Sequence, residues 1–259
     1  MKKNLIRLAA ALMLTVSLSA TAQNDFKGIV TYNVTSSGEM ATEVPEQIQN
    51  PQVKVMGDKV YLDERAASLF ATNAGFGIKG VNLEGRKTTI CYDFSQILAA
   101  ISQMGEELAT YRGDGKMMVS MESTQGAIDS LSIKDTEPGH FYLEYPEGQT
   151  KEIAGVSTQL ARIHVYSEDG VESTHDIWFA PDMGPKGNTI FNGVKGLPME
   201  MTLPLGEGRA FTVTATEVKK GKVKEVDFLM PEGFNKVTEE EFTTFMEEFS
   251  EVLQYLQEE

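Results

Sequence analysis

The three histidines, His140, His164 and His175, are the side chains whose chemistry is easiest to recognise in this sequence. His164 and His175 lie in two runs that are expected to form neighbouring strands, so their imidazoles could approach each other. A metal site would still need a third ligand, and Asp176 or Glu172 is the nearest acid. Ordinary surface or strand-edge histidines are the more frequent case. We therefore predict no metal site and no cofactor.

The motifs of common hydrolases are absent from the sequence. It contains neither a Gly-x-Ser-x-Gly nucleophile motif nor a His-Glu-x-x-His zinc motif. The chain has 38 acidic residues, but none lies in a clearly apolar run of the kind that prepares a carboxyl group for general acid catalysis. We predict that the protein is not an enzyme.

Apolar side chains are the more informative feature, because the chain has 13 methionines and a single tryptophan. Methionine adapts to irregular apolar partners, and a half-exposed tryptophan contacts acyl chains well. Both residue types are also common in protein cores, and they lie there more often than in a ligand-binding cleft. The residues that we predict to line a lipid cleft, or else to belong to the core, are Trp178, Met199, Met201, Phe211, Phe245 and Phe249.

Alternating polar and apolar residues predict strands along most of the chain. The run 26–35 places its aromatic and β-branched side chains on one face, as expected for a strand with one buried side. Glycine-containing turns predict hairpins at 57–58, 84–85 and 167–170. Residues 127–133 are predicted to add a further strand to an antiparallel meander. The whole chain then has about ten short strands.

Two segments have helical periodicity instead. Residues 93–110 place apolar side chains three and four positions apart, and Asp93 or Ser95 could cap this helix. Near the C-terminus, Thr238 and Glu241 have the spacing of a capping box, and an apolar stripe follows over about 239–257. An amphipathic helix beside strands needs a sheet to lie against. The fold class predicted from these elements is mainly β with α (α+β).

The first residues have the features of a signal peptide. A positive start is followed by an apolar run over 8–18 and a small-residue cleavage motif at 20–22. The apolar run is short for a bilayer span. We predict a cleaved signal peptide over 1–22, a single mature domain over 23–259, and an exported periplasmic protein that does not span the membrane.

Charge and cysteine content narrow the possible partners. The formal net charge is −15, and removal of the three basic residues of the signal peptide would make it −18. Such a chain repels phosphates, so we predict no nucleic-acid partner and no adhesion to anionic membranes. Cys91 is the only cysteine, which rules out an internal disulfide. We expect its thiol to be buried and inert.

Three pieces of the C-terminal half carry a family resemblance: TKEIAGVSTQLARIHV, IWFAPDMG, and GVKGLPMEMTLP followed by FTVTATEVKKGKV. Their succession resembles an uncharacterised exported family of Gram-negative bacteria that is related to periplasmic lipoprotein carriers (LolA/LppX-like). The Gly196-Leu197-Pro198 step is also similar to that of the GLPGLI family, although Met199-Glu200 follows here. The resemblance implies a strongly curved antiparallel sheet, an unclosed half-barrel, with amphipathic helices on its concave side.

The function predicted from these observations is that of a periplasmic binding or carrier protein. Its ligand would be a lipid, an acyl chain or a lipoprotein, held in a cleft between the curved sheet and the helices. The alternative is a non-enzymatic cell-envelope interaction protein whose own helices fill the interior and whose acidic surface docks a partner. A void of several hundred Å³ on the concave side would favour the carrier, because that is the usual size of a ligand pocket.

Overall fold

The structure is a computed structural model that describes residues 26–38, 43–71, 74–103, 113–206 and 209–258. The predicted signal peptide over 1–22 lies outside the described residues, and so does the part of the predicted helix 93–110 that follows residue 103. In the part of the chain that is described, no helix is both long enough and apolar enough to cross a bilayer.

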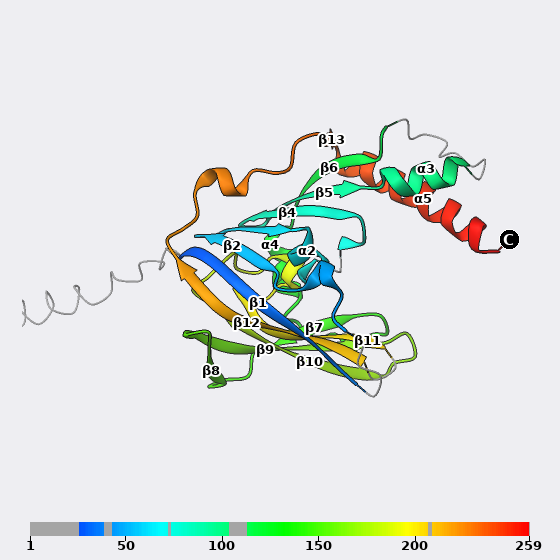
Figure 1. Cartoon of the computed structure of the whole chain (residues 1–259). Coiled ribbons are helices and arrows are strands. Elements are labelled where there is room, and N and C mark those ends of the chain that lie inside the picture. Colours follow the sequence, from blue (N-terminus) through cyan, green and yellow to red (C-terminus); the bar gives the residue numbers. More distant parts are fainter. Residues whose placement is uncertain (1–25, 39–42, 72–73, 104–112, 207–208, 259) are drawn as a thin grey trace, which may run out of the picture.

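One sheet of 13 strands organises the molecule (Figure 1). The strands follow the order β13-β6-β5-β4-β3-β2-β1-β12-β11-β10-β9-β7, and β8 pairs with β9 beside this path. Neighbouring strands are antiparallel except for β13 and β6. The strands are β1 (Lys27–Ser37), β2 (Gln52–Met56), β3 (Lys59–Asp63), β4 (Ile78–Glu84), β5 (Lys87–Asp93), β6 (Lys116–Glu122), β7 (Phe141–Glu144), β8 (Thr150–Ile153), β9 (Val156–Tyr166), β10 (Glu172–Ala180), β11 (Leu197–Gly206), β12 (Arg209–Lys220) and β13 (Asn235–Val237).

The sheet does not close into a barrel, because its end strands β13 and β7 pair with β6 and β9 and not with each other. Successive twisted strands curve the sheet, so that β4 to β6 and β9 to β11 lie on opposite sides of α2 and α4 in Figure 1. The predicted fold class is therefore confirmed: an α+β fold built on a curved, unclosed antiparallel sheet with helices on its concave side.

The concave face of the sheet is apolar. Val60 and Leu62 of β3, Val81 and Leu83 of β4, and Ile90 of β5 are all 0% exposed. Leu62 lies opposite Val81, and Val81 lies opposite Ile90, so these side chains form a continuous layer across three strands. An apolar layer of this kind must be covered to keep water away from it.

Helix α2 (Glu64–Phe70) provides part of the cover. It begins directly after β3, where the carboxylate of Asp63 accepts a hydrogen bond of 2.9 Å from the Ala66 backbone N–H and caps the helix. The buried side chains of the helix are those of Ala66, Ala67, Leu69 and Phe70. The Phe70 ring meets the Tyr32 ring edge-on, with centroids 4.9 Å apart, and so joins the helix to β1.

The connection between β10 and β11, residues 181–196, provides a second part of the cover, and we call it the plug. Met183, Ile190, Phe191 and Val194 of the plug are buried. Its short 3-10 helix η3 (Thr189–Phe191) places Phe191 edge-on to Phe70 at a centroid distance of 6.1 Å. A buried loop is unusual, because each of its backbone polar groups then needs a partner inside the protein.

Asn188 supplies several of those partners and is 0% exposed. Its amide nitrogen donates to the Gly85 carbonyl at 3.1 Å and to the Thr88 hydroxyl at 3.3 Å. Its amide oxygen accepts from the Ile190 backbone N–H at 2.9 Å and caps η3. One side chain thus ties the plug to the β4–β5 hairpin.

The Gly196-Leu197-Pro198 step has a structural role at the end of the plug. A Cβ atom at Gly196 would lie 2.2 Å from the Ala180 carbonyl oxygen, so only glycine allows β11 to start this close to β10. Leu197 is 0% exposed, and the buried Tyr32 hydroxyl donates to the Pro198 carbonyl at 2.8 Å.

Helix α5 (Glu239–Glu258) begins at the predicted capping box, which is confirmed. The Thr238 N–H donates to the Glu241 carboxylate at 2.7 Å, and the Glu241 N–H donates to the Thr238 hydroxyl at 3.1 Å. Phe245 and Phe249 of α5 are buried. Helix α3 (Ser95–Gln103) occupies the described part of the other predicted helix, and Ile101 is its buried residue.

The convex face of β3 to β5 is covered by the segment 225–234, which contains the 3-10 helix η4 (Glu225–Phe228). The Asn82 amide donates to the Phe228 carbonyl at 2.8 Å, and Pro231 approaches Gly80. Cys91 lies beneath this segment and is 0% exposed. Burial raises the pKa of the Cys91 thiol to about 11, so the expectation of a buried, inert thiol agrees with the structure.

One local prediction was wrong. Residues 125–130 form helix α4 (Gln125–Ser130) where the predicted strand 127–133 should begin, because the Thr124 hydroxyl accepts from the Ala127 N–H at 3.1 Å and caps a helix. Ile128 is the only buried residue of α4, so the short alternation of residue types in this segment does not correspond to a buried strand face. At its other end the sheet finishes with β13, which follows η4.

We predict that Asn188→Ala lowers the free energy of unfolding by about 2–3 kcal/mol, because it leaves buried donors and acceptors of the plug and the β4–β5 hairpin without partners. The measurement is equilibrium denaturation by urea. Asn33→Ala is the matched control, since Asn33 is exposed on β1 and its loss should change stability by less than about 0.5 kcal/mol. Equal effects of the two substitutions would contradict the anchoring role of Asn188.

Candidate functional site

A pocket of about 590 Å³ lies on the concave side of the sheet, where neither α2 nor the plug covers β5 and β6, and we call it the inner pocket. It is bounded by β5 and β6, by the segment 123–124 with α4, by η3 of the plug and by the start of α5. Its lining residues are Ala74, Thr88, Ile90, Tyr92, Met121, Glu122, Ser123, Thr124, Ala127, Thr189, Ile190, Glu239 and Phe242.

The floor of the inner pocket is apolar and rigid. Ile90 is fully buried, and Ile190 approaches the same space from the plug. Thr88 lies opposite Met121 in the pairing of β5 with β6, so the Met121 side chain shares the face of Thr88 and Ile90. Met121 is only partly buried and has a flexible thioether, which suits contact with apolar ligands of different shapes.

Tyr92 forms one wall of the inner pocket and is held in place from both ends. Its hydroxyl donates to the Ala74 carbonyl at 2.8 Å, and its ring stacks on Phe242 of α5 at a centroid distance of 4.7 Å. Burial raises the pKa of the Tyr92 hydroxyl to about 12, so the group stays neutral at physiological pH. Tyr92 therefore acts as a neutral, fixed contact surface.

The rim of the inner pocket is polar. Ser123 and Thr189 bring their hydroxyl oxygens within 3.4 Å of each other, and Thr124 caps α4 beside them. Glu122 and Glu239 are exposed carboxylates at this rim. An apolar floor below a polar rim fits a ligand with an apolar chain and a polar head.

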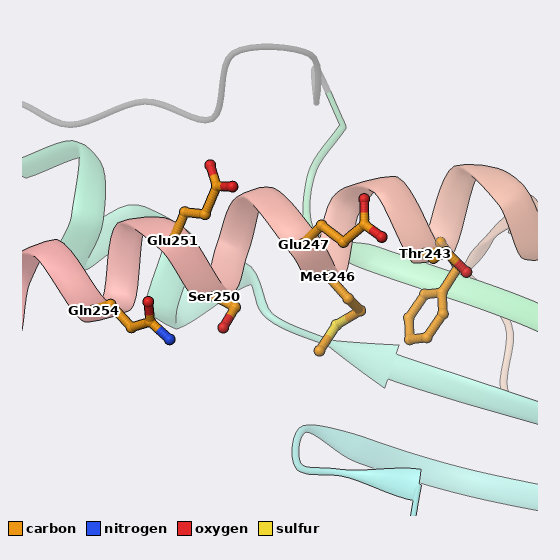
Figure 2. Close-up of a pocket in the computed structure, with 7 residues that line it drawn as sticks. Thr243, Met246, Glu247, Ser250, Glu251 and Gln254 are labelled. Carbon is orange, nitrogen blue, oxygen red and sulfur yellow. The ribbon is translucent and has the colours of Figure 1, made fainter.

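A second hollow of about 490 Å³ follows α5 away from the inner pocket, and we call it the α5 groove. Phe242 is part of the lining of both hollows. Figure 2 shows Met246, Ser250 and Gln254 along one side of α5, whereas Glu247 and Glu251 extend from the opposite side. The groove is more polar and more open than the inner pocket, because its lining comes from a single exposed helix face.

The six predicted ligand residues do not come together in the structure. Met199 and Met201 of β11 are 0% and 7% exposed and face the concave side beside Val213 of β12. Phe211 lies opposite Leu203 and is partly buried in the same region. These three residues lie on β11 and β12, in the half of the sheet that follows the plug. No lining residue of the inner pocket belongs to it.

Phe245 and Phe249 lie at the other end of the sheet. Both pack on Phe94, with ring centroids 5.2 Å and 5.4 Å away, and they stack on each other at 5.4 Å. They fasten α5 beside the inner pocket, and the pocket lining includes their neighbour Phe242 instead. Contact of Phe245 or Phe249 with a ligand remains a prediction.

Trp178 lies on the convex face of the sheet. Its neighbours Ile177 and Phe179 are buried on the concave side, so alternation along β10 directs the indole outward. The Lys151 ammonium lies 4.4 Å from the centre of the indole and 2.6 Å from the Glu200 carboxylate. The tryptophan therefore stabilises the β8 hairpin by a cation–π contact, away from the inner pocket.

His164 and His175 do not share a site. His164 lies opposite Thr174 and His175 opposite Ile163, so strand alternation places the two imidazoles on different faces of the sheet. His164 is instead bound between two carboxylates, with Nδ1 2.7 Å from Glu172 and Nε2 2.9 Å from Glu144. The expected approach of His164 to His175 is therefore corrected by the register of β9 and β10.

Among the described residues, the structure brings together one group of possible metal ligands that the sequence analysis missed, Asp135, Glu137 and His140. Their ligand atoms lie within 4.8 Å of one another in an exposed turn. The Asp135 carboxylate accepts from the Glu137 N–H at 3.0 Å and lies 2.6 Å from His140 Nδ1, which raises the pKa of His140. These contacts explain the group as a turn closed by an ion pair, without a metal.

Most residues that line the inner pocket were also missed, and their signals in the sequence were weak. Nothing in the sequence distinguishes Met121, Ile90 and Tyr92 from ordinary strand residues. Ala127 fell in the segment wrongly predicted as a strand. The apolar stripe of α5 did indicate Phe242. What placed these residues around one space was the pairing of β5 with β6 and the path of the plug.

Comparisons with known proteins leave the family open. No protein-family model matches this chain, and no curated protein matches it. Among solved structures, the chain resembles the lipoprotein LppX of Mycobacterium tuberculosis, with 13% identity, a TM-score of 0.26, and coverage of 78% of this chain and 90% of LppX. It also resembles a LolA-superfamily protein of Nitrosomonas europaea, with 9% identity, a TM-score of 0.28, and coverage of 80% and 91%. Likeness at this level carries no argument about a ligand.

We predict that the fluorescence of Trp178 reports on the β8 hairpin and not on the inner pocket. Lys151→Ala should uncover the indole, shift its emission to longer wavelength and increase quenching by acrylamide, because the alkyl chain and ammonium of Lys151 cover the ring. A long-chain monoacylglycerol added to the unmodified protein should leave the emission unchanged. A strong response to that ligand, with no response to Lys151→Ala, would contradict this assignment.

Proposed function

We propose that this protein is an exported periplasmic binding or carrier protein that holds the apolar part of a lipid, acyl or lipoprotein ligand in the inner pocket. The observation that carries the proposal is a space of about 590 Å³ above the apolar floor of Ile90 and Ile190. Ligand pockets commonly measure about 300–1,000 Å³ and combine an apolar lining with a few polar groups. The inner pocket has both properties.

The burial of a chain in this space would supply part of the binding energy. Transfer of one methylene from water to an apolar site contributes about 0.8 kcal/mol, so about eight buried methylenes contribute about 6 kcal/mol before the costs of association. Tyr92 and Ile90 are held in place without a ligand, which keeps the cost of organising the pocket low. Micromolar binding needs about 8 kcal/mol net, so a ligand of that affinity must bury a longer chain or add contacts from its head group.

The position of the pocket indicates the end of the sheet at which a ligand would enter. The plug already fills the concave side opposite β11, where Met183 and Val194 are buried. A ligand would therefore enter at the β5–β6 end and could extend into the α5 groove past Phe242. The predicted signal peptide and the resemblance to the exported carrier-related family both support the proposal of an exported carrier.

A cell-envelope interaction protein with a self-filled interior is the second candidate. The buried plug favours it, because the chain covers most of its own concave face. The two candidates differ in whether the inner pocket is occupied in the cell. Extraction of protein purified from the periplasm, followed by lipid mass spectrometry, should yield a bound lipid if the carrier proposal is correct.

We predict that Ala127→Phe weakens binding of a long-chain monoacylglycerol by at least about tenfold, because the larger side chain enters the pocket from α4. Isothermal titration calorimetry measures the affinity. The matched control is Ala100→Phe, an exposed alanine on α3, which should leave the affinity unchanged. Equal affinity of the two variants would contradict the pocket assignment, and a complete lack of binding by the unmodified protein would contradict the carrier function.

A further inference from the structure

Residues 125–145, which we call the strap, connect the two ends of the open sheet. The chain leaves the sheet at β6, beside the end strand β13, forms α4 and rejoins the sheet as β7, the other end strand. The strap packs closely on the plug. A Cβ atom at Gly187 would lie 2.6 Å from the Ile128 side chain, and one at Gly193 would overlap Leu131. Because α4 bounds the inner pocket, the strap forms one wall of that pocket.

His164 of β9 holds the β7 end of the strap. Its Nδ1 lies 2.7 Å from the Glu172 carboxylate of β10, and its Nε2 lies 2.9 Å from the Glu144 carboxylate of β7. The ring stacks on Tyr142 of β7 with centroids 4.4 Å apart, and the side chain is only 12% exposed. A neutral imidazole can donate to one of these carboxylates, whereas an imidazolium donates to both. The arrangement therefore fits the charged form of His164.

The groups closest to His164 keep their own charge state around neutral pH. The hydrogen bond from His164 lowers the pKa of the Glu172 carboxyl, which therefore stays charged. Desolvation and a hydrogen bond with Glu172 raise the pKa of the Tyr166 hydroxyl to about 12, so this group stays neutral. Lys134 of the strap adds a positive charge near Glu172.

Two further ion pairs lie near this cluster, and each is closed within itself. The Arg162 guanidinium of β9 lies 2.7 Å from the Asp176 carboxylate, and His140 lies 2.6 Å from the Asp135 carboxylate. The His140 pair closes a turn inside the strap, whereas His164 connects the strap to β9 and β10. Imidazole is the side chain that ordinarily changes its charge between about pH 5 and 8.

We propose that His164 is a pH-sensitive clamp on the strap. The protonated imidazole joins β7 to β10 across β9 through its two carboxylates. After loss of the proton, the lone pair of one ring nitrogen faces a carboxylate, and one of the two hydrogen bonds is lost. The strap then opens more often and uncovers the α4 side of the inner pocket. The clamp itself does not depend on the proposed function, whereas control of ligand access rests on it.

The sign of the pH effect follows from the geometry of the closed strap. Opening takes Glu144 away from His164, so the closed form binds the proton more tightly than the open form. Closing is therefore favoured at low pH, and this contribution is lost as the pH rises through the titration of His164. The loss of one hydrogen bond between charged, partly exposed groups should make opening about fivefold more frequent.

The test is hydrogen–deuterium exchange of the full mature chain at about pH 5.5 and about pH 8, corrected for the intrinsic pH dependence of exchange. The protection of the amides in β7 should be about fivefold lower at the higher pH. His164→Gln, which has no proton to lose, should remove this difference. The matched control is His175→Gln, which lies on the other face of the same hairpin and contacts Ser173, and it should keep the difference.

A second variant and a ligand experiment complete the test. Glu144→Gln removes one partner of the clamp and should reduce the pH difference even if His164→Gln does not fold. Access is measured by stopped-flow fluorescence with a monoacylglycerol that carries a pyrene-labelled chain. Its association rate should rise from about pH 5.5 to about pH 8 in the unmodified protein and stay constant in His164→Gln.

The outcomes separate the clamp from the carrier function. Equal protection of β7 at both pH values would overturn the clamp. A pH difference that persists in His164→Gln would also overturn it, because another group, such as His140, would then be responsible. An association rate that does not change with pH would overturn the control of access. No binding of the monoacylglycerol, together with the expected exchange results, would overturn the carrier function and leave the clamp in place.

Discussion

The structure depends on covering the concave face of one open sheet. Strand alternation places a continuous apolar layer on that face, from β1 through β6, and such a layer is stable in water only when other apolar groups lie on it. A closed barrel would cover the face with its own opposite wall, but this sheet ends at β13 and β7. The cover must therefore come from segments outside the sheet, and their positions determine where space remains.

Three segments share this task, and each is held by a specific polar contact. Asp63 caps α2 where it leaves β3, Asn188 fastens the plug to the β4–β5 hairpin, and Thr238 with Glu241 starts α5. The Asn188 contacts satisfy groups that would otherwise lose water without gaining a partner. The two helix caps determine where α2 and α5 begin.

The inner pocket is the region that these three segments leave uncovered. Its floor consists of the same kind of side chains as the core, and its rim consists of the ends of α4, η3 and α5. The binding proposal therefore needs no residue with unusual chemistry. It needs an apolar face, an incomplete cover and a polar rim. On the convex face, Lys151 lies over the indole of Trp178.

The sequence by itself determined the local features. The run 26–35, the hairpin at 57–58 and the capping box at Thr238 were predictable, because strand alternation, tight turns and helix caps depend on residues close together in the chain. The segment 127–133 was not, because a hydroxyl cap at Thr124 decided its structure where only Ile128 is buried. Only the tertiary structure decided which apolar residues surround a space. Met201, Phe249 and Trp178 satisfy the same sequence criteria, but the curvature of the sheet and the path of the plug place them in three separate regions. The physical reason is that a sequence pattern gives the face of a strand on which a side chain lies, whereas a pocket depends on long-range packing, namely on which distant segment covers that face.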